Sequence, residues 1–96
     1  MNDFRQLIDV NFSELHIGQV VYQVETKVLF VIIALVGSFP HTESVREDEI
    51  DLLSEKGRVS NIFHLWGEKF LLLDATIPEN RWPYYKEELQ AIRKSL

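Results

Sequence analysis

The nine consecutive apolar residues from Val28 to Val36 constrain the fold more than any other feature of this sequence. A membrane-spanning helix needs about 20 such residues, so the run predicts an element buried inside a soluble domain. Its Val and Ile content favours a β-strand, although the periodicity of a short apolar run also fits a buried helix. Gly37 and Pro40 follow the run and mark its end. We therefore expect a central strand here and no membrane partner.

Residues on either side of this run give the next elements. Val20, Tyr22 and Val24 alternate with other residues, which predicts a half-buried strand that residues 25–27 join to the central one. Segments 2–12 and 44–56 carry helical patterns. In the first, apolar residues recur at helical spacing; in the second, a capping box begins the helix and a glycine ends it. The residues that carry these two patterns are Phe4, Leu7, Ile8, Ser44, Glu47 and Gly57.

Residues 59–76 predict a β-hairpin with its turn at Gly67-Glu68, because glycine suits the first central position of a tight hairpin turn. Strand alternation then makes both faces of the hairpin apolar, whereas a sheet with one solvated face would show polar residues there. One face carries Phe63, Leu65, Phe70 and Leu72, and the other carries Ile62, His64, Trp66, Leu71 and Leu73.

A last helix follows a loop at residues 77–83, with Pro83 in its first turn. Its apolar stripe has helical spacing and consists of Tyr85, Leu89, Ile92 and Leu96. The element order is thus α-β-β-α-β-β-α. Strand pairs separated by helices favour an α+β fold, a two-layer sandwich of a mostly antiparallel four-stranded sheet with helices on one face. We expect residues 1–96 to form one such domain.

Composition excludes several classes of function. The chain has no cysteine, so disulfides, thiolate metal sites and cysteine nucleophiles are absent, and no signal-peptide pattern is present. A net charge of −5 disfavours nucleic acid as a partner. The three histidines, His16, His41 and His64, lack the spacing of metal ligands. We expect a cytoplasmic protein without a metal or cofactor, and no motif predicts catalysis.

The doubly apolar hairpin favours a non-enzymatic protein-interaction domain that self-associates as a homodimer. A small domain has too few helices to cover both faces of its sheet, and a second copy covers the remaining face. The interface residues expected on this basis are Ile62, His64, Trp66, Leu71 and Leu73. The alternative for His64 is a histidine packed at the sheet surface, with no catalytic or interface role.

A small-ligand-binding or enzymatic domain is the second hypothesis. An arginine lies among aromatic residues at 81–85, a combination that is typical of interface hot spots and of ligand pockets. The same residues also suit the seal between the last helix and the sheet. The predicted pocket consists of His64, Asp74, Arg81, Trp82 and Tyr85.

An acidic inhibitor or immunity-type protein is the third hypothesis. The predicted helix 44–56 is rich in carboxylates, which would attract a basic protein partner. Alternatively, the carboxylates form a solvated face that complements the helix dipole. The docking residues expected are Glu47, Asp48, Glu49 and Asp51.

Overall fold

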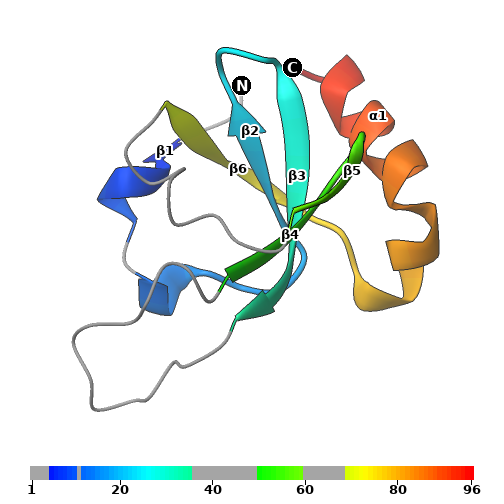
Figure 1. The fold of residues 1–96 in the computed structure, drawn as a ribbon, viewed down its shortest axis with the longest axis horizontal. Helices are drawn as coiled ribbons and strands as arrows, with labels where there is room; N and C mark the ends of the chain where they lie inside the picture. The colour runs from blue at the N-terminus through cyan, green and yellow to red at the C-terminus, as the bar shows by residue number, and fades with distance from the viewer. Residues whose placement is uncertain (1–4, 11, 36–49, 60–68) are drawn as a thin grey trace.

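A computed structural model describes residues 5–10, 12–35, 50–59 and 69–96 of the chain (Figure 1). Six antiparallel strands form one sheet in the order β1-β6-β2-β3-β4-β5. A single α-helix in these residues, α1, covers part of one face. The strands and helix are β1 (Arg5–Gln6), β2 (Gln19–Gln23), β3 (Val28–Leu35), β4 (Ile50–Ser54), β5 (Gly57–Val59), β6 (Phe70–Thr76) and α1 (Tyr85–Lys94). Short 3-10 helices are η1 (Leu7–Asp9), η2 (Phe12–Glu14) and η5 (Glu79–Tyr84).

The predicted mixture of sheet and helix is confirmed, but the four-stranded sheet in the order α-β-β-α-β-β-α is wrong. The central strand and the strand before it are present as β3 and β2, paired as an antiparallel hairpin. In the turn between them, Lys27 adopts a positive φ of 59°. This is the left-handed region that glycine usually occupies, which explains why a turn without glycine still closes.

The helix predicted over residues 2–12 is wrong. Arg5 and Gln6 pair with β6, and a 3-10 helix follows directly. In a 3-10 helix, residues i and i+3 lie on one side, so Leu7 and Val10 can both be buried without an α-helix. The apolar spacing does indicate that one side of this segment is buried, but the segment is too short to favour an α-helix over pairing with the sheet.

The helix predicted over residues 44–56 is also wrong where the structure describes it. Residues 50–54 form β4, in which Ile50, Leu52 and Ser54 are buried and the residues between them are half-buried. This is the period of a strand, and pairing with β3 on one side and β5 on the other fixes it. Gly57 begins β5 directly after the tight β4–β5 turn and pairs with Ser54, whose hydroxyl donates a hydrogen bond to the Gly57 carbonyl.

Two apolar clusters lie on opposite faces of the sheet. Leu7, Val10 and Leu15 cover the first face, which includes Phe30 and Phe70. We call it the N-terminal face. Helix α1 covers the second face through Leu89, which is 0% exposed, with Tyr85 and Ile92 half-buried beside it. We call this the helix face. The buried sheet residues of the helix face are Val20, Leu29, Val31 and Leu73.

The C-terminal prediction was largely correct, with two differences. Pro83 lies in η5, and α1 begins at Tyr85. Leu96, the last member of the predicted stripe, is 46% exposed beyond the end of the helix. An ion pair between Arg93 and Glu55 joins α1 to the β4–β5 turn, and Figure 1 shows the helix on that side of the sheet, away from β1.

Replacing Leu89 by Ala should destabilise the protein by about 3 kcal/mol, because it removes the fully buried anchor of α1 and leaves a cavity. Urea unfolding followed by circular dichroism measures this change. Gln90→Ala, at an exposed position of the same helix, is the matched control and should shift stability by less than about 0.5 kcal/mol. Equal effects of the two substitutions would contradict the packing of α1 on the sheet.

The second prediction about the fold concerns Gly18. Its N–H donates to the Ile32 carbonyl at 2.7 Å, its carbonyl accepts from the Ile77 N–H at 2.6 Å, and its φ is +97°. A Cβ at this position would lie 2.4 Å from the Ile77 carbonyl oxygen. Gly18→Ala should therefore destabilise the protein by about 2 kcal/mol or more in the same urea experiment.

The matched control for this substitution is Gly57→Ala. Gly57 also has a positive φ, +156°, but a Cβ there meets no atom within 4 Å. This substitution adds backbone strain without a close contact, so it should lower stability less. A Gly18→Ala variant as stable as Gly57→Ala would show that the close approach at Gly18 does not constrain the fold.

Candidate functional site

A depression of about 260 Å³ lies on the N-terminal face, where β6 runs between β1 and β2. Its position follows from the register of these three strands. Arg5 of β1 and Val21 of β2 both pair with Leu72 of β6, so their side chains share one face of the sheet. The residues that line the depression are Arg5, Gln19, Leu72, Leu73 and Asp74.

A shift in the register between β2 and β6 lies beside this depression. Between the pairs Gln19–Thr76 and Val21–Leu72, the three β6 residues 73–75 lie opposite the single β2 residue Val20. Such bulges bend a strand and redirect its side chains, and they are common beside functional sites. Leu73 and Asp74 belong to this irregular stretch, and both line the same hollow as Leu72.

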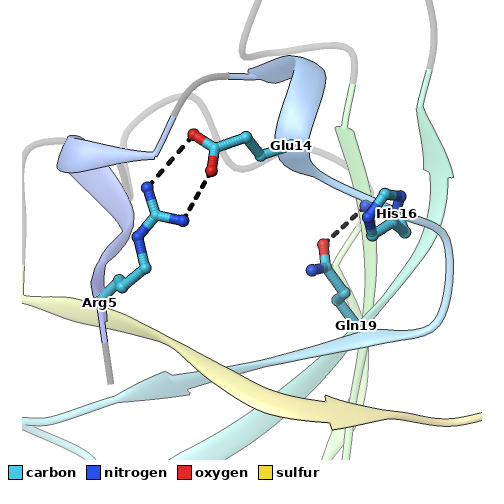
Figure 2. Close-up of polar contacts among 4 residues, drawn as sticks. All are labelled: Arg5, Glu14, His16 and Gln19. Carbon is cyan, nitrogen blue, oxygen red and sulfur yellow. Dashed lines mark hydrogen bonds and ion pairs between the residues drawn. The ribbon is translucent and has the colours of Figure 1, made fainter. Parts of the chain in front are cut away.

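The Arg5 side chain is held by Glu14 of η2. Its Nη1 and Nη2 atoms donate to the two carboxylate oxygens of Glu14 at 2.7 and 3.2 Å, as Figure 2 shows. The hydrogen bonds and the negative charge of Glu14 raise the pKa of Arg5 above its ordinary value. This two-point contact orients the guanidinium, although both side chains are exposed and the pair is screened by solvent.

Gln19 lies at the start of β2 on the other side of the depression. Its Oε1 accepts a hydrogen bond from the backbone N–H of His16 at 2.6 Å. This bond fixes the orientation of the amide, and in Figure 2 the amide nitrogen is turned toward Arg5. The two N–H groups of the Gln19 amide are therefore donors directed at the hollow.

Charge in this region is unbalanced. Arg5 contributes one positive charge, while Glu14, Asp74 and Asp9, which also acts electrostatically on Arg5, contribute one negative charge each, so these described residues carry a net charge of −2. Asp74 is exposed and forms no ion pair with any residue that the structure describes. Among the described residues, the hollow thus presents the Asp74 carboxylate without a cation and the Gln19 amide nitrogen without an acceptor.

The arginine and aromatic residues of the predicted pocket lie elsewhere. The Arg81 guanidinium carbon is 4.9 Å from the centre of the Tyr84 ring, and its Nη2 atom lies 3.2 Å from Glu88 Oε2. Trp82 donates from Nε1 to the Ile77 carbonyl at 3.3 Å and packs with Tyr85 against the helix-face cluster. Trp82 and Tyr85 thus help to pack α1 against the sheet, and none of the residues 81–85 lines the depression with Asp74. His64 lies outside the described residues.

The predicted interface residues are placed only in part. Ile62, His64 and Trp66 lie outside the described residues, as does the predicted turn at Gly67-Glu68. Leu71 and Leu73 project to the helix face, opposite Phe70 and Leu72, as the alternation predicted. Leu73 is 3% exposed and shares a cluster with Leu89 of α1, whereas Leu71 is half-buried.

The predicted acidic docking residues do not lie on a helix where the structure describes them. Asp51 is in β4, 3.6 Å from Arg58 of β5 across an ion pair. Glu47, Asp48 and Glu49 lie outside the described residues.

Sequence reasoning missed Arg5, Glu14 and Gln19. No local motif marks them, because Arg5 and Glu14 are nine residues apart and come together only through the chain path between β1 and β2. The helix expected over residues 2–12 also concealed the pairing that places Arg5 beside Leu72. Asp74 was identified from the sequence, but with partners different from those the structure gives it.

The described residues contain no group of three or more histidine, cysteine, aspartate or glutamate side chains suited to a metal ion. They also contain no helix with the length and apolar character needed to cross a membrane. Comparisons with protein families, with curated proteins and with solved structures give no match to this chain. The geometry of the described residues is therefore the basis for a functional proposal.

Conservative substitutions of the polar residues that line the depression should leave the stability of the fold almost unchanged. Asp74→Asn and Gln19→Glu should each change stability by less than about 0.5 kcal/mol. Asp74 is exposed, and a carboxylate in place of the Gln19 amide keeps an oxygen that accepts the His16 N–H. Urea unfolding measures both. A larger loss for Asp74→Asn would show that its carboxylate has a structural role within the fold.

Proposed function

We propose that this chain is a small non-enzymatic protein-interaction domain that self-associates through the helix face of its sheet. The observation that supports this is an apolar strip beside α1. Tyr22 and Leu71 are direct cross-strand neighbours on β2 and β6, and both are half-buried. Val24, whose N–H donates to the carbonyl of Lys69 just before β6, lies at the end of the strip and is 38% exposed.

The position of α1 explains why this strip is uncovered. The helix packs against β3, and its Arg93 is fixed to Glu55 at the β4–β5 turn. Strands β2 and β6 lie on the other side of β3, away from that turn. One helix of ten residues covers the middle of this face, and a second copy of the chain offers a matching apolar surface to the rest.

Tyr22 gives the strip the character of an interface. A tyrosine buries a large area at little cost in side-chain entropy, and its hydroxyl can remain hydrated. The flanking strands also restrict how partners can associate. Edge strands β1 and β5 have two and three residues, so they offer little backbone for pairing with another sheet. Association through side chains of the helix face is the remaining geometry for the described strands.

The experiment is the molar mass in solution, measured by light scattering over a range of protein concentrations. The wild type should approach twice the 11.3 kDa mass of one chain. Val24→Glu should weaken the dimer about tenfold, because it places a charge in an apolar contact. Ile17→Glu is the matched control: Ile17 is also an exposed aliphatic residue, at 47%, but lies before the other end of β2.

A wild type that stays monomeric at every concentration would contradict self-association. A dimer weakened equally by Val24→Glu and Ile17→Glu would contradict the assignment to this strip.

A second candidate function is the binding of a small ligand in the depression of the N-terminal face. The specific observation in its favour is the convergence of Arg5, Gln19 and Asp74 from three neighbouring strands on one hollow. This retains Asp74 from the predicted pocket and replaces the aromatic residues as its partners. The two candidates use opposite faces of the sheet and are compatible.

A further inference from the structure

Polar residues and two buried leucines line the depression of the N-terminal face. Asp74, Gln19 and the Arg5–Glu14 pair surround it, and Leu72 and Leu73, which are 7% and 3% exposed, contribute to its lining. We propose that it binds a small ligand carrying a primary ammonium group next to a neutral hydrogen-bond acceptor. This inference rests on the ligand-binding function proposed above and names its ligand chemistry.

The ammonium group is inferred from Asp74. Asp74 lines the hollow, is exposed, and has no ion-pair partner among the described residues. The cation among the described lining residues, Arg5, already has its two terminal nitrogens on Glu14. A primary ammonium has three donors on a compact charge and therefore fits a carboxylate approached from an open depression.

The neighbouring acceptor is inferred from Gln19. Because the His16 N–H holds Oε1, the Nε2 group is oriented before a ligand arrives, and Figure 2 shows it turned toward Arg5, which also lines the depression. A carbonyl or hydroxyl oxygen of the ligand accepts a hydrogen bond from it. Fixing a donor in advance reduces the entropy lost on binding.

The net negative charge around the depression favours a ligand whose hydrogen-bond acceptor is neutral over a ligand whose acceptor is a carboxylate. A ligand carboxylate would compete with Glu14 for Arg5 and would be repelled by the carboxylates of Glu14 and Asp74. An amide carbonyl avoids both costs. The volume of about 260 Å³ lies just below the usual range of ligand pockets, which favours a ligand of a few non-hydrogen atoms.

Two sources share this chemistry. A free amino amide and the N-terminus of a peptide both place an ammonium group one carbon away from an amide carbonyl. Glycinamide and triglycine amide represent the two sources. If only glycinamide binds, the ligand is a free small amine; if both bind equally, it is a chain terminus, and either result supports the proposal.

The experiment is a titration of the ¹⁵N-labelled full chain followed by backbone amide chemical shifts. Glycinamide should shift the amides of Arg5, Gln19 and Asp74 saturably, and methylammonium, which lacks the acceptor, should bind about fivefold more weakly. Acetamide, which lacks the ammonium group, should not saturate. Acetate should not saturate either, because it brings a carboxylate alone.

Two variants assign the roles of the side chains. Asp74→Asn should weaken glycinamide binding about tenfold, the loss of one charge-assisted contact. Glu79→Gln, which removes an exposed carboxylate on η5, is the matched control and should leave binding unchanged. Gln19→Glu keeps the bond to the His16 N–H but replaces the amide donor, so glycinamide should lose its advantage over methylammonium.

The possible failures are distinguishable. Saturable binding of acetate or acetamide at the same amides, unaffected by Asp74→Asn, would overturn the ammonium chemistry and leave the ligand-binding function standing. Absence of saturable shifts with every compound would overturn both.

Discussion

The burial of β3 on both of its faces is the constraint on which the rest of the structure depends. Val28 to Ile32 are five consecutive buried residues, so each face of the sheet needs its own cover. The chain provides two different covers, the 3-10 helices near its N-terminus and α1 near its C-terminus. Neither cover is large. The outer part of each face therefore stays accessible to solvent, with an apolar strip on the helix face and a polar depression on the N-terminal face.

Strand β6 connects this double cover to the candidate sites. It lies between β1 and β2, and its alternate residues enter the two clusters, Phe70 and Leu72 on one side and Leu71 and Leu73 on the other. The register shift opposite Val20 interrupts its regular pairing with β2, and Leu73 and Asp74 of this stretch line the depression. Gly18 makes this geometry possible. Its carbonyl accepts a hydrogen bond from the N–H of Ile77, just beyond β6, and the two backbones lie so close that a side chain at position 18 would clash with the Ile77 carbonyl.

The two surfaces that result have different chemistry. The helix face leaves an apolar strip of Tyr22, Val24 and Leu71, which suits another apolar surface. The N-terminal face leaves a polar hollow with an excess negative charge, which suits a small cation with an acceptor. Both are binding features, and the chemistry proposed for them needs neither a nucleophile nor a metal. A binding domain is therefore the function class that we propose for this chain.

The sequence by itself determined the elements whose apolar pattern has one physical solution. These are β2, β3, the alternation of β6 and the amphipathic α1, because strands and helices bury residues with distinct periods. Only the tertiary structure decided the N-terminal segment and β4, where helical spacing and capping signals are worth about 1 kcal/mol and pairing with the sheet outweighs them. It also decided the site, since Arg5, Gln19 and Asp74 meet through strand order and a bulge. Such long-range pairing leaves no local pattern in the sequence.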